Sequence, residues 1–224
     1  MRESSRPGRY GPATSFENSE TGPRARRRLT GSRLRGTVLE RVAQASTIFI
    51  VTIDLADMDR GVYESFELRV ARHPSETGAF MLVRILAYCL EYCDGIEMTA
   101  GLSSTDIPAL LVRDLTGRVT AWIEVGLPDA ERLHRGSKLA DRVAVYTHRD
   151  VRQLLAQLDG ARIHHADAIP IRAFDRTVIE QIADLLDRRT SLALTVAGGD
   201  LHVSLGDQMF AVPMTEHRLS QSRS

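Results

Sequence analysis

The sequence predicts a mixed α/β fold, in which a layer of strands packs against helices around one core. The first observation is that segments with the strand period of two alternate along the chain with segments of helical period. The second is that 43% of the 224 residues are hydrophobic, an ordinary globular fraction that excludes collagen-like and fully disordered chains. The predicted order is two strands, a helix, two strands, a helix, a strand, a helix, a weak strand, a helix and two strands.

Residues 1–45 are expected to form a disordered, arginine-rich extension. Residues 1–36 hold nine arginines and three glutamates, a net charge of +6, so the rest of this formally neutral chain carries −6. Large apolar residues are few here, and the burial that they offer cannot offset the entropy of ordering. The arginines of residues 24–28 can touch RNA, DNA or acidic lipid. The simpler interpretation is a solvated tail or an over-extended gene start.

The cysteines and the apolar runs indicate a cytoplasmic protein. Cys89 and Cys93 are too few for a disulfide framework. The longest apolar runs, such as Ile48–Ile53, fall far short of the ~20 residues that span a bilayer. No membrane partner is therefore expected.

The fold is expected to begin near Ser46 with an antiparallel hairpin. Ser46–Leu55 is an almost unbroken run of β-branched and apolar residues, which suits a strand buried on both faces. A turn at residues 57–61 follows. In Tyr63–Val70, apolar and charged residues alternate, which predicts a half-buried strand.

A core helix and a second hairpin come next. The helix is predicted to open at Pro74–Glu76 and to run to about Tyr92, because it is apolar nearly all round. Cys89 and Cys93 would lie on one face of it as buried structural thiols. The hairpin comprises Ile107–Arg113 and Val119–Val125 across a turn at 114–117.

The remaining elements alternate helices with strands. In the strand Val119–Val125, the odd-numbered side chains share one face, and Thr120, Trp122 and Glu124 share the other. A helix to about Ala140 follows. A central strand, a helical stripe, a weak strand, a helix capped by Asp175 and a terminal hairpin are then predicted at Val143–Tyr146, Val151–Leu158, Ile169–Ile171, Val178–Leu186 and Leu192–Leu205. Residues 213–224 are expected to be a frayed tail.

Carboxylates at the ends of these elements are the candidates for chemistry. Glu76 opens the core helix, Asp106 precedes a hairpin strand and Glu124 lies near the end of the next strand. Hard oxygen ligands at one sheet edge are what Mg²⁺ requires, and a metal of this kind assists attack of water on a phosphodiester. No phosphate-binding glycine loop, nucleophile elbow or zinc-protease motif occurs in the sequence.

Several motifs, in order, resemble those of the YaeQ family of bacterial proteins. The most specific is Ala71–Thr77, with the sequence ARHPSET. The others are Ala56–Arg60, Arg84–Tyr88, Asp106–Leu110, Asp114–Gly117, Trp122–Asp129 and Val143–Thr147. The resemblance covers about Ser46 to Val212, which we expect to form a single domain.

The family in turn resembles the PD-(D/E)XK restriction-endonuclease-like fold, which implies a central mixed β-sheet flanked by helices. By that resemblance, Glu76, Asp106 and Glu124 would hold a metal such as Mg²⁺. The pattern expects an acid directly before Pro108, where this chain has Ile107. Asp106 stands one residue earlier, and a shift of one residue along a strand moves a side chain to the opposite face.

The second departure concerns the lysine of the pattern, because Gly126 occupies its position. Arg132, Arg135 or Lys138, the only lysine of the chain, can supply a cation instead. An arginine stabilises charge but cannot act as a base.

Two further residues of these motifs have structural as well as functional interpretations. Arg84 lies within an apolar helix and needs a carboxylate, for which Asp57 and Glu124 are the candidates, because a lone buried guanidinium is costly. Trp122 can stack a nucleic-acid base or cover a strand edge.

Two functions remain open at this stage. The favoured one is a degenerate, non-catalytic binding or regulatory protein, whose partner is nucleic acid or another protein. The alternative is a Mg²⁺-dependent nuclease in which Glu76, Asp106 and Glu124 hold the metal and an arginine steadies the phosphate. Convergence of the three carboxylates on one point would favour the nuclease.

Overall fold

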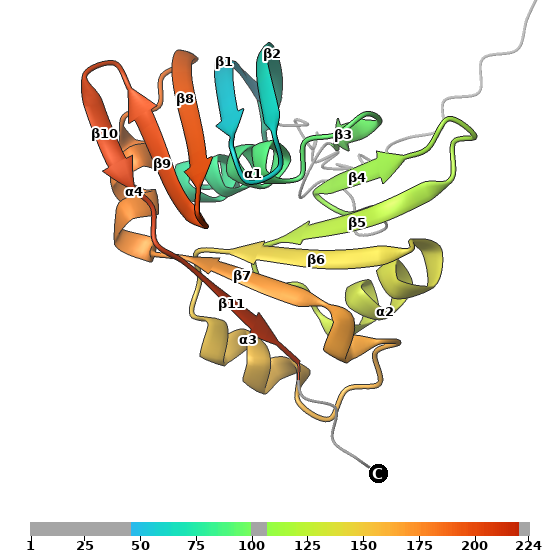
Figure 1. The fold of residues 1–224 in the computed structure, drawn as a ribbon. Helices are drawn as coiled ribbons and strands as arrows, with labels where there is room; N and C mark the ends of the chain where they lie inside the picture. The colour runs from blue at the N-terminus through green and yellow to red at the C-terminus, as the bar shows by residue number, and fades with distance from the viewer. Residues whose placement is uncertain (1–45, 100–106, 220–224) are drawn as a thin grey trace, which may run out of the picture. The chain divides into compact units, whose positions relative to one another are not determined.

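The strands of the described residues form two mixed sheets (Figure 1). The computed structural model describes residues 46–99 and 107–219, all within one unit that begins at Val42. Sheet A contains β10 (Gln208–Ala211), β9 (Asp200–Leu205), β8 (Arg189–Ala197), β1 (Thr47–Asp57) and β2 (Val62–Arg72), in this spatial order. Sheet B contains β11 (Met214–Arg218), β7 (Pro170–Phe174), β6 (Arg142–Thr147), β5 (Val119–Val125), β4 (Leu110–Arg113) and β3 (Ile96–Met98), in this spatial order.

Four α-helices accompany the sheets in the described residues. They are α1 (Gly78–Leu90), α2 (Ala130–Leu139), α3 (Val151–Leu158) and α4 (Arg176–Asp184), and a short 3₁₀ helix, η2, spans Ala166–Ala168. The mixed α/β class is confirmed, whereas the expectation of one central sheet is wrong. The terminal hairpin joins the first hairpin, since β8 pairs in parallel with β1.

The two hairpins of sheet A are also tied together at their turns. Asp59, in the turn between β1 and β2, accepts hydrogen bonds from the backbone N–H groups of Gly198 and Gly199, at 2.7 and 2.8 Å. These residues lie 139 and 140 positions further along the chain. A pairing between such distant segments leaves no local pattern in the sequence.

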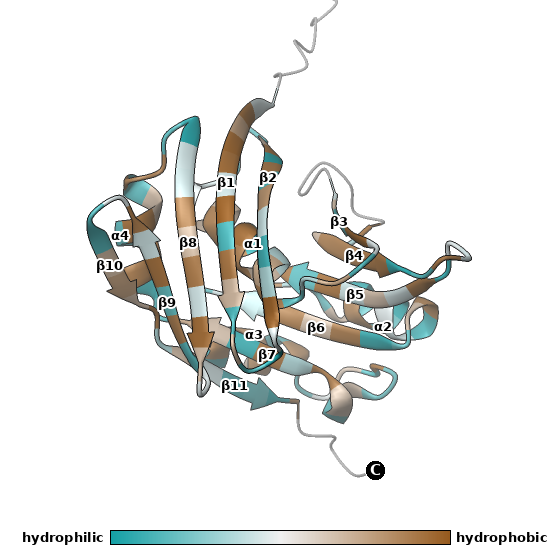
Figure 2. Cartoon of the chain, turned by 45° about the horizontal axis from the view of Figure 1, so that its top comes forward, coloured by the Kyte–Doolittle hydropathy of each residue, from teal (hydrophilic) through white to brown (hydrophobic). Residues whose placement is uncertain are grey.

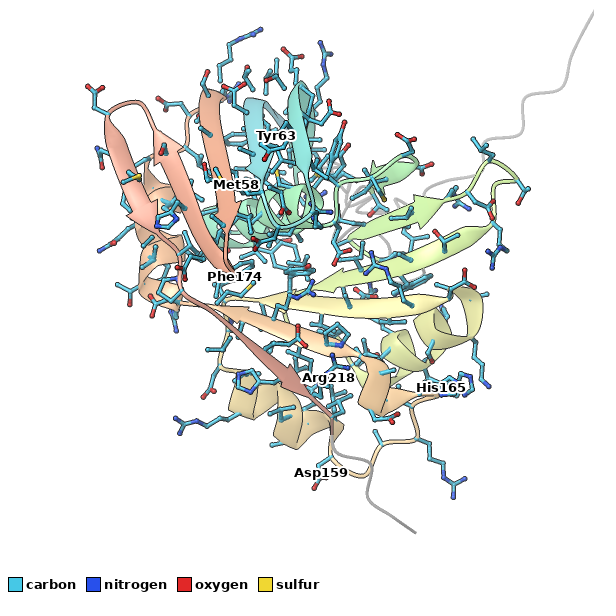
Figure 3. All side chains as sticks on the ribbon, viewed as in Figure 1. Met58, Tyr63, Asp159, His165, Phe174 and Arg218 are labelled. Atoms are coloured by element: carbon cyan, nitrogen blue, oxygen red, sulfur yellow. The ribbon has the colours of Figure 1, made fainter. Side chains whose placement is uncertain are left out.

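Sheet A is buried on one face only. In β1, Phe49, Val51 and Ile53 are buried, whereas the alternate residues are exposed or half-exposed. The expectation that Ser46–Leu55 is buried on both faces is therefore wrong, and Figure 2 shows hydrophilic bands along the sheet A strands. Figure 3 places the exposed side chains of Met58 and Tyr63 on this sheet.

Helix α1 belongs to the core that both sheets share, as its apolar circumference predicts. It begins later than predicted, at Gly78, because the Thr77 hydroxyl caps it by accepting from the backbone N–H of Phe80 at 3.1 Å. It ends at Leu90, so Cys89 is buried within it while Cys93 lies beyond it and is exposed. The expectation of two buried thiols on one helical face is correct only for Cys89.

Strand β5 separates two cores, as its alternation predicts. Ala121, Ile123 and Val125 contribute to the larger core with α1, whereas Trp122 belongs to a second core with residues of α2 and α3. Helix α2 can lie close to the indole because it carries Gly136, where a Cβ would come within 2.6 Å of Trp122. The two faces of β5 thus look toward different helices.

The C-terminal half follows the predicted order up to β9, and two strands that were not predicted, β10 and β11, come after it. Strand β6 is buried and lies in parallel between β5 and β7, and Asp175 caps α4. Within the stretch expected to be a frayed tail, Met214–Arg218 forms β11, which pairs antiparallel with β7. Its alternate polar residues carry too weak an apolar pattern to predict an edge strand. No helix in the described ranges is long and apolar enough to cross a membrane.

Candidate functional site

Glu76 lies in a buried ion pair next to the beginning of α1. Its carboxylate is 3.0 Å from the guanidinium of Arg84, and both side chains are 0% exposed. It also accepts from the backbone N–H of His73 at 3.2 Å, while its own N–H donates to the carbonyl of His73 at 2.8 Å. The loop 73–76 therefore folds back on itself and directs the acid inward.

The guanidinium of Arg84 connects this loop to sheets A and B. Besides Glu76, it donates to the carbonyls of Ala71 at 3.2 Å and Thr99 at 2.7 Å. Its Nε has no partner in the described part of the chain. The sequence indicated correctly that Arg84 needs a carboxylate, but Asp57 and Glu124 are not the partners: Asp57 pairs with Arg60.

Glu124 is held in a second buried pair, on the α2 face of β5. Arg132 forms a bidentate pair with this carboxylate, with Nε 3.1 Å from Oε1 and Nη2 2.9 Å from Oε2. The indole N–H of Trp122 donates to Oε1 at 2.8 Å. Glu124 is only 2% exposed, so this carboxylate has a two-pronged arginine partner and a third donor.

The Trp122 ring is thus unavailable to a nucleic-acid base. It is 4% exposed, packed under Gly136 and bonded to Glu124. Of the two interpretations given for this residue, burial within the protein is the one that the structure supports.

The two carboxylates lie on different faces of sheet B but reach one segment. Glu124 faces α2, whereas α1, which follows Glu76, packs on the opposite face. Arg132 donates to the carbonyl of Ile107 at 2.9 Å. From the other side, Thr99, which accepts from Arg84, donates to the carbonyl of Pro108 at 2.6 Å. The segment before β4 is therefore hydrogen-bonded to Arg132 directly and to Arg84 through Thr99.

Asp106, the third predicted acid, lies outside the described residues. Within the described ranges, no group of three or more His, Cys, Asp or Glu side chains is placed to hold a metal ion. The carboxylates of Glu76 and Glu124 are arranged to accept hydrogen bonds from guanidinium groups, and in this arrangement they do not fit a Mg²⁺ site.

Gly126 stands where the resemblance expects a lysine, and the backbone there suits only glycine. Its φ is +93°, and a Cβ would come within 2.9 Å of the Phe80 ring. A lysine at this position would meet both the conformational penalty and the clash.

The replacement cations are placed unequally. Arg132 in the first turn of α2 contacts Glu124, and Arg135 is 3.4 Å from Glu131. Lys138 is exposed in the last turn. Six residues of helix separate Lys138 from Arg132, which is about 9 Å along the axis. Arg132 is thus joined by hydrogen bonds to Glu124, one of the predicted site acids.

A pocket opens at the carboxyl ends of the parallel strands β5 and β6. Its volume is about 230 Å³, and it is lined by Ser75, Glu76, Thr77, Phe80, Gly126, Leu127, His148 and Arg149. Ligands of α/β sheets commonly bind at such an edge. Burial and then Arg149 lower the pKa of His148, which is 3% exposed and whose Nδ1 has no partner in the described residues. Sequence reasoning missed His148, although its place directly after the central strand was a usable signal.

A buried polar cluster beyond the C-terminus of α1 was also not predicted. Glu91 accepts from the hydroxyl of Tyr146 at 2.6 Å and pairs with Arg142 and Arg172. Burial and then the nearby Glu91 raise the pKa of Tyr146. The cluster ties α1 to β6 and β7, which gives it a structural role.

Comparison of the sequence with known proteins identifies a matching family. A sequence model described as "YaeQ: YaeQ protein" matches residues 42–214. The "Uncharacterized protein YaeQ" of Escherichia coli (strain K12) is 30% identical over 165 residues, which cover 73% of this chain and 91% of that protein. The protein of the same name from Salmonella typhi matches at 30% over the same length.

Solved structures agree with this match. The crystal structure of YaeQ protein from Pseudomonas syringae superposes with a TM-score of 0.70 and 32% identity, covering 80% of this chain and 98% of that one. The YaeQ protein from Xanthomonas axonopodis pv. citri superposes with a TM-score of 0.71 and 25% identity, covering 78% and 99%.

Proposed function

The chain belongs to the YaeQ family, and we propose that it is a non-catalytic binding or regulatory protein on a scaffold related to restriction endonucleases. One observation carries the proposal: both described candidate acids are buried and engaged by arginine. Glu76 pairs with Arg84 and Glu124 with Arg132.

This pairing disfavours metal-dependent catalysis for a physical reason. An arginine stays protonated under all ordinary conditions, so neither carboxylate can be freed by loss of a proton from its partner. Displacing the guanidinium of Arg84 would leave a buried, unpaired charge at high cost. Gly126 stands in place of the lysine of the nuclease pattern, so this position supplies no amine either.

The proposed partner is nucleic acid or another protein, and the net charge and the salt dependence of binding distinguish these two kinds of partner. Residues 37–224 carry a net charge of −6, which opposes tight non-specific binding to phosphates. A flat salt dependence of binding favours a protein partner, and a steep one favours nucleic acid. Both described cysteines are free thiols, in keeping with the cytoplasm as the proposed compartment.

The second candidate is a Mg²⁺-dependent nuclease, and the pocket at the end of β5 and β6 favours it. Glu76 and Gly126, two positions of the nuclease pattern, line that one pocket. For this function Glu124 would have to give up its two-pronged contact with Arg132.

A cleavage assay decides between the two functions. The full chain is incubated with mixed DNA and RNA in the presence of Mg²⁺ or Mn²⁺, and wild type is compared with Glu124→Ala and Glu124→Gln. The matched control is Glu131→Ala, which removes an exposed acid of α2. Absence of cleavage, or equal residual cleavage in all proteins, supports the binding function. Cleavage that both Glu124 variants lose and Glu131→Ala keeps would overturn it, with circular dichroism confirming that the variants fold.

A further inference from the structure

The most specific motif of the sequence contains two basic residues whose side chains bond neither candidate carboxylate. Arg72 ends β2, and His73 begins the loop that follows. Both line a pocket of about 340 Å³ at the edge of sheet A, together with Thr47, Phe49, Pro74 and Arg188. This is where β1 and β8 begin and β2 ends.

We propose that this pocket binds a phosphate group, as an oxyanion site separate from Glu76 and Glu124. The proposal does not depend on the function proposed above. No acidic side chain is among the lining residues, whereas two guanidinium groups and an imidazole are. Like charges gathered in one concavity repel each other, and an anion relieves that repulsion.

Arg72 is oriented before any ligand arrives. Its Nε donates to the backbone carbonyl of Glu76 at 2.9 Å, and its guanidinium lies 5.9 Å from the centre of the Phe49 ring. Both contacts fix the plane of the fork. No described residue accepts from the two terminal nitrogens, so they remain as a pair of parallel donors, the geometry that suits phosphate oxygens.

Ser75 sets the tautomer of the neutral His73 ring. Its Nδ1 accepts from the backbone N–H of Ser75 at 3.2 Å and lies 2.6 Å from the Ser75 hydroxyl. A ring nitrogen that accepts cannot carry the proton in the neutral imidazole, so the proton is on Nε2. Nε2–H is therefore a second donor of the loop.

Arg188, directly before β8, is the second arginine that lines the pocket. It is exposed, and its side chain makes no hydrogen bond or ion pair with the described residues. Its own carbonyl accepts from the N–H of Ile50 at 2.8 Å, which anchors its backbone beside β1. Thr47, whose hydroxyl can donate, also lines the pocket. A lining of two arginines, an imidazole and a hydroxyl offers more donors than a carboxylate has oxygens, and it suits the oxygens of a phosphate.

The test is isothermal titration calorimetry of the full chain with inorganic phosphate at low salt. Arg188→Ala is the main variant, and Arg189→Ala is the matched control, since it removes the same charge one residue away without lining the pocket. We expect Arg188→Ala to weaken phosphate binding about ten-fold, the size of one charge-assisted hydrogen bond, and Arg189→Ala to leave it unchanged. Arg72→Lys, which keeps the charge and loses the fork, should weaken it as well.

A second titration identifies the source of the phosphate. A nucleoside monophosphate and a 5′-phosphorylated single-stranded oligonucleotide are compared, each with its dephosphorylated form. A preference for both phosphorylated forms supports the site, and tighter binding of the oligonucleotide assigns it to a nucleic-acid end. Equal binding by Arg188→Ala and Arg189→Ala, or no heat with millimolar phosphate, would overturn the proposal. Either result leaves the cleavage assay on Glu124 unaffected.

Discussion

Replacing Arg84 by methionine tests the buried ion pair at the start of α1. The substitution keeps most of the side-chain volume but leaves Glu76 charged and without its cation. Breaking a fully buried pair costs about 3–5 kcal/mol, and two carbonyls, those of Ala71 and Thr99, also lose a donor. We expect the free energy of unfolding to fall by about 4 kcal/mol, which lowers Tm by roughly 8–16 °C in a domain of this size.

Urea denaturation followed by circular dichroism measures this loss. The reference is Arg176→Met, which breaks an exposed pair with Glu180 (66% and 49% exposed) and should cost about 0.5 kcal/mol or less. The double variant Glu76→Met/Arg84→Met should recover part of the loss, because it removes the unpaired charge. A cost for Arg84→Met no larger than that of Arg176→Met would refute the reasoning.

Three further predictions concern the pocket at the end of β5 and β6 and the thiols. Gly126→Ala should lower the free energy of unfolding by about 1–3 kcal/mol, measured by thermal denaturation, because of the positive φ and the contact with Phe80. Burial holds the pKa of His148 below the ordinary value of about 6.5, so the unfolded state binds more protons than the folded state. Stability from this group is therefore full above about pH 6.5 and falls as the pH falls, and denaturation of His148→Asn against pH should show a shallower acid slope. Burial raises the pKa of the Cys89 thiol to about 12 and also raises that of Cys93, so native alkylation followed by mass spectrometry should modify the exposed Cys93 slowly and Cys89 only after unfolding.

Each of these predictions has its own control. Gly117→Ala shares the positive φ but has open space around the added Cβ, so a smaller loss than at Gly126 isolates the contact with Phe80. His134→Asn, which changes an exposed histidine, is the matched control; equal slopes for both histidine variants would contradict the role of burial. Cys93→Ser should abolish native alkylation, and persistent labelling of that variant would contradict the burial of Cys89.

Local patterns in the sequence were enough to predict the elements that depend on near neighbours. The alternation in β5 placed Trp122 and Glu124 on one face, and Asp175 marked the start of α4, because capping and periodicity act over a few residues. The pairing of β8 with β1 could not be predicted in this way. Apolar residues of a strand show that one face is buried, but not which sheet the strand joins.

The site was predicted in part for a similar reason. Burial of Arg84 indicated a carboxylate partner, yet the choice of Glu76 depends on how the loop 73–76 folds back, which no periodicity encodes. For Gly126, the sequence shows only that the lysine expected at this position is missing. Its positive φ and its closeness to Phe80 come from the packing of the β5–α2 connection on α1.

The bond from Asp59 to Gly198 and Gly199 has a consequence for synthesis of the protein. The nascent chain leaves the ribosome with β1 and β2 first, whereas the partners of Asp59 are 139 and 140 residues behind. At about 5–20 residues per second, roughly 7 to 28 seconds pass before β8 can cover the edge of β1. During that interval the edge of β1 that later pairs with β8 is open to wrong pairings.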